Sequence, residues 1–206
     1  MKKTGGKHTN VHKLVQVAML SAVAFLLMLI ELPLPFIAPD FYKIDLSEVP
    51  VLIAGFAMGP VAGIVTEFVK ILLHTLVKGT QTAFVGELAN FIVGCALVVP
   101  AALIYRHHKS KHSALIGMIT GTILMAAVGV LLNAYVLLPA YGKAFNMPID
   151  AFVEMGAAIN PHVNSILAFC FLLVAPFNII KGAIVTLITM LLYKRISVVL
   201  KSFWNR

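Results

Sequence analysis

Long apolar stretches with almost no charge constrain this chain more than any other feature of its sequence. Residues 14–30 carry no ionisable side chain, and four longer, predominantly apolar stretches follow. An apolar helix of about 20 residues crosses a hydrocarbon core that is roughly 30 Å thick. The chain is 60% hydrophobic and only 12% charged, whereas a soluble domain has about 25% charged residues. These features predict an all-α integral membrane protein and exclude a water-soluble enzyme or a nucleic-acid-binding protein.

The apolar stretches predict a six-transmembrane-helix bundle that forms one membrane domain. One stretch, residues 49–77, is longer than a single span needs but shorter than two full spans. It contains Gly59-Pro60, a pair that favours a turn because proline cannot donate a backbone hydrogen bond inside a helix. We therefore divide this stretch into two short helices. After a tail of residues 1–13, the predicted spans are residues 14–35, 49–58, 61–77, 83–105, 114–138 and 165–193.

The basic residues predict how this bundle lies in a cell membrane. Eleven of them, with no acidic residue, lie in the two terminal tails and the loop of residues 106–111, while the connections on the other face hold three basic and six acidic residues. Because cytoplasmic loops collect lysine and arginine, we expect both termini to be cytoplasmic, which requires an even number of spans. The eleven residues are Lys2, Lys3, Lys7, Lys13, Arg106, Lys109, Lys111, Lys194, Arg195, Lys201 and Arg206.

Two of the outer connections are candidates for a functional role. Residues 36–48 contain a proline and three aromatic side chains, and residues 141–164 form a longer loop that we expect to be ordered only in part. Ordered loops of that length are usually lids or binding elements. The two cysteines, Cys95 and Cys170, lie in apolar runs without metal-ligand spacing, so neither a disulfide nor a metal site is predicted.

Apart from Glu31 near the end of the first span, four charged residues fall inside the predicted spans: Glu67, Lys70, Glu87 and Lys181. Charges in a membrane are costly and mark functional sites by default. Glu67 and Lys70 are three residues apart on one helix face, so they form either part of a polar site or a neutral pair buried in protein. Lys181 shares its face with Asn178 and has no acidic residue within one turn. Its charge therefore needs a partner from another helix or from a ligand.

Asparagine side chains are the other polar groups within the apolar stretches. Asn133 stands alone in its run, and we expect it to converge with Asn178, Lys181 and the charged groups of the third and fourth spans on one polar cavity beneath the outer loops. Amides offer both hydrogen-bond donors and acceptors, which suits a neutral, planar ligand. The sequence has neither a phosphate-binding loop nor a hydrolase motif. We therefore expect a binding protein and not an enzyme.

Two other classes of function remain open from the residues alone. Glu67 or Glu87 could act as the acid or base of an intramembrane enzyme. Alternatively, Glu67 and Lys70 could form the relay of an ion-coupled secondary transporter. Such transporters are often built from repeated halves, and no internal repeat is visible in this sequence.

Small residues mark one face of the first span. Ala18 and Ala22 are four residues apart, a spacing that lets another helix approach closely inside a membrane. Alanine is also common in membrane spans, so the spacing by itself does not identify a partner.

Three segments give the chain a resemblance to a known family. They are Lys43-Ile-Asp-Leu-Ser-Glu-Val-Pro50, Gly59-Pro-Val-Ala-Gly63 and Phe177-Asn-Ile-Ile-Lys-Gly182. Together with six short spans and a broken hairpin, they resemble the riboflavin-specific substrate-binding (S) components of energy-coupling-factor (ECF) transporters, over nearly the whole chain. The resemblance implies a riboflavin-binding subunit without a cofactor or an ATPase of its own. It also implies partners, namely a transmembrane scaffold subunit and two ATP-binding cassette subunits that use ATP.

The resemblance further implies roles for individual residues. The flavin ring would be held by Asn133, Asn178 and Lys181, and the first outer loop would close over it. Ala18 and Ala22 would dock the scaffold subunit. With the polar pair of the third span included, the candidate substrate-binding residues are Asn133, Asn178, Lys181, Leu46, Asp45, Phe41, Lys70 and Glu67.

Overall fold

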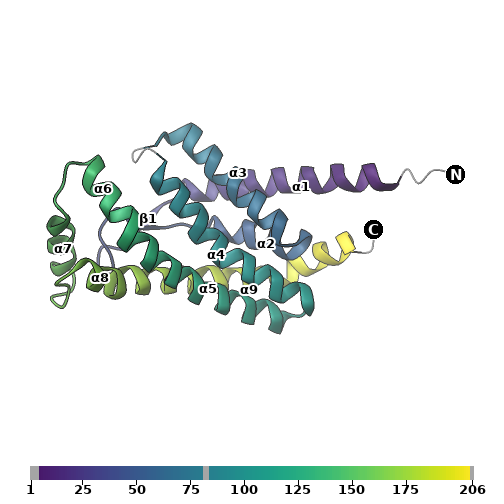
Figure 1. Cartoon of the computed structure of the whole chain (residues 1–206). Helices are drawn as coiled ribbons and strands as arrows, with labels where there is room; N and C mark the ends of the chain where they lie inside the picture. Colours follow the sequence, from purple (N-terminus) through teal and green to yellow (C-terminus); the bar gives the residue numbers. More distant parts are fainter. Residues whose placement is uncertain (1–4, 81–83, 205–206) are drawn as a thin grey trace.

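The computed structural model describes residues 5–80 and 84–204, and the side chains of residues 11–80 and 84–192. The long helices run roughly along one axis and form a bundle (Figure 1). In chain order the elements are α1 (Gly5–Met28), β1 (Leu32–Pro33), β2 (Lys43–Ile44), α2 (Glu48–Met58), α3 (Pro60–Lys78), α4 (Val85–His107), α5 (Lys111–Leu132), η1 (Asn133–Leu137), α6 (Leu138–Ala144), α7 (Ile149–Ala157), α8 (Ile166–Phe169), η2 (Cys170–Val174) and α9 (Ala175–Trp204), where η denotes a π-helix.

The described residues contain five helical stretches that are long and apolar enough to cross a membrane. The helix α2 is not among them, because its 11 residues extend only about 16 Å at 1.5 Å per residue. Nine of these residues are buried in the bundle. The prediction of an integral membrane helical bundle is therefore confirmed. The five stretches are Val11–Met28, Pro60–Lys78, Val85–His107, Lys111–Ala144 and Ile166–Leu192.

The first helix ends earlier than the expected span of residues 14–35. It stops at Met28, and the chain then forms β1, which pairs antiparallel with β2. Pro33 and Pro35 explain this end, because proline lacks a backbone N–H and disfavours the helical conformation in the residue before it. Ala83, where the fourth span was expected to begin, lies outside the described residues. Three of the basic tail residues that predict the orientation, Lys2, Lys3 and Arg206, also lie outside the described residues.

The break expected at Gly59-Pro60 is the point where α2 ends and α3 begins. Gly59 has a φ of 97°, a conformation that costs glycine little because it has no Cβ. Pro60 is the first residue of α3, where its missing N–H is not needed and its fixed φ suits a helix start. The Gly-Pro pair thus turns the chain back between two helices without an intervening loop.

Two of the long helices contain a π-helical turn, in each case just before a proline. Pro139 follows η1 and Pro176 follows η2. A proline ring clashes with the carbonyl group four residues earlier, which belongs to Tyr135 in η1 and to Leu172 in η2. A wider turn relieves this clash, and π-turns of this kind are frequent at functional sites.

The two ends of the bundle differ in composition. The start of α1, the end of α9 and the turn between α4 and α5 lie at one end, whereas β1, α6, α7 and α8 lie at the other (Figure 1). Apolar side chains form the core toward the first of these ends. Its fully buried members include Leu52, Leu97, Met118 and Val185. The loop of residues 141–164, expected to be ordered in part, contains the end of α6 and all of α7. A cavity lined by charged and amide side chains lies at this second end.

Candidate functional site

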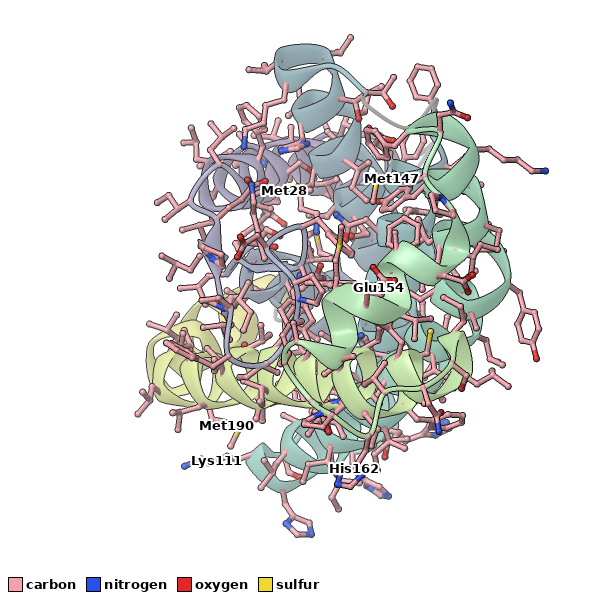
Figure 2. All side chains as sticks on the ribbon, turned by 90° about the vertical axis from the view of Figure 1, so that its left-hand side faces the viewer. Met28, Lys111, Met147, Glu154, His162 and Met190 are labelled. Carbon is pink, nitrogen blue, oxygen red and sulfur yellow. The ribbon has the colours of Figure 1, made fainter. Side chains whose placement is uncertain are left out.

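A cavity of about 590 Å³ lies at the end of the bundle that holds the strands and α7. Its walls come from the end of α1, the first outer loop, α3, α4, η1, α6 and the residues after it, α7 and α9. Figure 2 looks onto this end, with α7 and its Glu154 toward the viewer. Met28 and Met147, which both line the cavity, lie apart from each other in this view.

Two asparagine amides line this cavity, and each is oriented by its own helix. Asn133 is the first residue of η1, and its Nδ2 donates to the carbonyl oxygen of Gly129 at 2.8 Å. Asn178 lies four residues after the end of η2, and its Nδ2 donates to the carbonyl oxygen of Val174 at 2.9 Å. An amide nitrogen carries two hydrogens. Each side chain therefore keeps an N–H for a second partner.

Gly129 provides space for these two amides. Its carbonyl oxygen accepts the bond from Asn133, and a Cβ at this position would lie 2.8 Å from Nδ2 of Asn178. Any larger residue would therefore push Asn178 out of place. No sequence pattern indicates this role, because it depends on the contact between α5 and α9.

The lysine of the last span is paired with the first outer loop. Lys181 Nζ lies 3.0 Å from Oδ2 of Asp45, and both side chains border the cavity. Oδ1 of Asp45 accepts the backbone N–H of Ser47 at 2.8 Å. Burial by itself would raise the pKa of Asp45, but the ammonium groups of Lys181 and Lys70 and the bonds from Ser47 lower it to about 2. The sequence predicts that the charge of Lys181 needs a partner from elsewhere in the chain or from a ligand. In the structure this partner is Asp45.

Aromatic side chains from the first outer loop cover the amides. The hydroxyl of Tyr42 donates to Oδ1 of Asn133 at 2.5 Å, and its ring lies 5.5 Å from that of Phe177 between centroids. Phe41 meets Phe152 of α7 edge to face at 6.3 Å. Burial raises the pKa of Tyr42 well above its usual value. The hydroxyl therefore stays protonated and acts as a donor.

The mouth of the cavity carries a second set of charges centred on Glu31. This carboxylate lies 2.9 Å from Lys43 and 3.1 Å from Lys78, and His74 is 3.7 Å away. Burial would raise the pKa of Glu31, but the two lysines lower it. These contacts join the end of α1 to β2 and to the end of α3.

Glu67 and Lys70 lie behind the cavity and do not line it. Both are fully buried, and Lys70 Nζ lies 2.7 Å from Oε2 of Glu67 and 2.9 Å from Oε1 of Glu48. The same ammonium group donates to Oγ of Ser47 at 3.1 Å. Of the two interpretations of Glu67 and Lys70, this geometry matches the pair buried in protein, with Glu48 as a third member.

The remaining predicted residues are placed as follows. Asn133, Asn178, Lys181, Asp45 and Phe41 come together around the cavity, whereas Leu46 is half-buried and does not line it. Sequence reasoning did not select Tyr42, Gly129 or Glu48 for the site, although Tyr42 and Glu48 belong to the first outer loop that it did select. Among the described residues, no three His, Cys, Asp or Glu side chains are grouped so that they could hold a metal ion.

The small-residue pair of α1 faces away from the cavity. Ala18 and Ala22 are both exposed. Ser21, beside them, is fully buried, and its hydroxyl faces the carbonyl oxygen of Thr66 in α3 at 3.5 Å. The helix thus packs on α3 with one face and leaves the alanines on its outer surface.

The comparison with known protein families decides the identity of this fold. The family model described as "ECF transporter, substrate-specific component" matches residues 12–193. The chain belongs to this family. As an ECF substrate-specific component it is a multi-pass protein of the cell membrane and a transport subunit, not an enzyme.

Individual relatives agree with this assignment. The chain is 39% identical to "Riboflavin transporter RibU" of Staphylococcus aureus (strain TCH60), over 92% of each chain. It is 36% identical to "Riboflavin transporter FmnP" of Bacillus subtilis (strain 168), over 89% of this chain and 91% of that one. A solved structure described as the S component of a bacterial ECF transporter superposes with a TM-score of 0.71 at 36% identity. It covers 93% of this chain and 99% of the other.

Proposed function

We propose that this ECF substrate-specific component binds riboflavin at the outer face of the membrane and hands it to an ATP-driven partner module. One observation carries this proposal. Asn133, Asn178 and Lys181 stand together on the wall of a single cavity, in a chain whose high-coverage relatives are named riboflavin transporters.

The chemistry of the cavity wall supports a flavin ring as the ligand. The pyrimidine edge of a flavin presents carbonyl oxygens and an imide N–H, so it both accepts and donates hydrogen bonds. The two amides supply acceptors and donors, and the ammonium group of Lys181 supplies donors alone. Phe41, Tyr42 and other rings add apolar faces against which a flat ligand packs.

Charge and size also support riboflavin, which is uncharged at neutral pH. The lining holds three acidic and three lysine side chains, so their formal charges cancel: Glu31, Asp45, Glu87, Lys43, Lys78 and Lys181. The volume of about 590 Å³ falls within the range of roughly 300–1,000 Å³ that is common for small-molecule sites. A balanced cavity of this size favours a neutral ligand over an anion.

The partners that we propose are a transmembrane scaffold subunit and two ATP-binding cassette subunits. Ala18 and Ala22 support a docking site on α1, because both are exposed on the side of the helix that does not pack on the bundle. Exposed small residues let a second helix come close, and close packing drives helix association in lipid.

We also propose that the chain crosses the membrane six times with both termini in the cytoplasm. In this topology α2 makes the second crossing although it is too short to span the hydrocarbon core alone, and its buried surface supports a place inside the bundle. A cysteine placed at Asn146, between α6 and α7, should react with a membrane-impermeant thiol reagent on intact cells. A cysteine placed at Ser110, between α4 and α5, should not. The reverse pattern would overturn both the orientation and the even number of crossings.

The binding proposal is tested directly with the purified protein. We expect the preparation to be yellow, with riboflavin identified by absorbance and mass spectrometry. Added riboflavin should lose its fluorescence on binding, because the ring meets quenching aromatic neighbours such as Tyr42 and Phe177. Colourless protein that leaves riboflavin fluorescence unchanged would overturn the proposal.

A further inference from the structure

The buried cluster of Glu48, Glu67 and Lys70 is connected to the cavity wall by one short segment, residues 45–48. At one end of this segment, Asp45 pairs with Lys181 in the cavity. At the other end, Ser47 and Glu48 both bind the ammonium group of Lys70. Within the segment, the backbone N–H of Ser47 donates to Asp45. An unbroken series of polar contacts therefore runs from Lys70 to Lys181.

We propose that Lys70 is a positioning residue for the ligand, a role that rests on the proposed binding of riboflavin. It holds segment 45–48 from behind, so that Asp45 places the ammonium group of Lys181 in the cavity. Lys70 itself has no exposed atom at the cavity wall. Its effect on the ligand is therefore indirect, through Asp45 and Lys181.

The geometry around Lys70 makes it a firm anchor. Its ammonium group has three partners within 3.1 Å, and two of them, Ser47 and Glu48, belong to the segment. The third, Glu67, is fixed on the same helix one turn away, and Gly94 of α4 leaves the space that this carboxylate occupies. Charge-assisted hydrogen bonds are short and strong, and a fully buried group cannot exchange them for bonds to water.

Lys181 depends on this anchor because its side chain is long and lies at the cavity wall. A lysine side chain has many rotamers, and fixing it costs entropy. Asp45 holds it at 3.0 Å, and the other oxygen of Asp45 is itself held by Ser47. If segment 45–48 were loosened, the ammonium group of Lys181 would stay in the cavity but would no longer be held in one position. Ligand affinity should therefore fall.

A double-mutant cycle on the full-length purified protein tests this role. We expect Lys70→Met to weaken riboflavin binding about tenfold, which corresponds to ~1.4 kcal/mol. In a Lys181→Ala background, the same change should cause no further loss, because the path through Lys181 is already broken. Riboflavin fluorescence quenching gives the affinity of all four proteins.

A second variant covers the case in which Lys70→Met does not fold. Ser47→Ala removes one acceptor of the Lys70 ammonium group and the side-chain bond to Asp45, and it keeps the backbone bond to Asp45. We expect a loss in the same direction of about threefold, again absent in the Lys181→Ala background. Thr66→Val is the matched control, because Thr66 is a fully buried residue of α3 one turn before Lys70. It should leave affinity unchanged in both backgrounds.

The outcomes separate this inference from the proposed function. Equal losses in the two backgrounds would mean general loosening of the bundle and would overturn the role of Lys70, as would unchanged affinity in both Lys70→Met and Ser47→Ala. Absence of riboflavin binding by the unmodified chain would instead overturn the proposed function itself.

Discussion

Two lysines in membrane-spanning helices, Lys70 and Lys181, share chemistry and differ in surroundings. Each pairs with a carboxylate of segment 45–48: Lys70 with Glu48 and Lys181 with Asp45. Lys70 is fully buried among three partners, whereas Lys181 keeps a side-chain exposure of 11% at the cavity wall. Burial decides what each charge can do, because only a group that reaches the cavity can meet a ligand. The difference predicts that Lys70 supports the fold and acts on the ligand only indirectly, through Asp45, whereas Lys181 contacts the ligand directly.

The largest effect that this comparison predicts is on stability. Removing one partner of a buried ion pair leaves an uncompensated charge and costs about 3–5 kcal/mol. We therefore expect Lys70→Met to lower the free energy of unfolding by about that amount, since Glu48 and Glu67 would both lose their counter-charge. Lys181→Met should cost less, because Asp45 borders the cavity. Reversible denaturation in detergent measures both, and equal losses would contradict the comparison.

The next effect is on affinity. We expect Lys181→Ala to weaken riboflavin binding by at least ~1.5–3 kcal/mol, the scale of a hydrogen bond to a charged group. Fluorescence titration of the purified variant measures this change. Unchanged affinity would remove Lys181 from the site and would leave the two lysines with the same, purely structural role.

A smaller effect is expected from the hydroxyl of Tyr42. Tyr42→Phe keeps the ring and removes the bond to Asn133. We expect riboflavin binding to weaken by about 0.5–1.5 kcal/mol, the net value of one neutral hydrogen bond, because the amide loses a group that holds it in place. Tyr135→Phe is the matched control, since Tyr135 lies on η1 beside Asn133 but is 69% exposed. A gain of affinity in Tyr42→Phe would show that this hydroxyl competes with the ligand.

The sequence was sufficient for those features that depend on local chemistry. Uncharged runs indicate membrane helices, Gly59-Pro60 marks the turn between α2 and α3, and the isolated charge of Lys181 requires a distant partner. Contacts between elements could not be predicted in this way. The spacing of Glu67 and Lys70 is equally compatible with a cavity and with a buried pair, and only the packing of α2 against α3 and α4 distinguishes the two. The role of Gly129 likewise depends on α9.

The smallest expected effect on flavin affinity comes from a substitution on α1, far from both lysines. This substitution tests whether the losses of affinity expected for the Lys181 and Tyr42 variants are specific to the cavity. Ala22 is exposed on the outer surface of α1, so Ala22→Trp should leave both riboflavin affinity and stability of the isolated protein unchanged. The same indole would separate the helix from a scaffold helix that packs closely on it. ATP-dependent riboflavin uptake by the assembled transporter should therefore be abolished.

The neighbouring Val23→Trp serves as the control for this change. Val23 is also exposed, but it points about 100° away from Ala22 around the helix, because an α-helix has 3.6 residues per turn. It should therefore retain uptake. Loss of uptake in both variants would mean that any bulky residue on α1 blocks assembly. Loss of flavin binding in Ala22→Trp would instead show that Ala22 supports the fold, and uptake retained in both would place the docking surface on another helix.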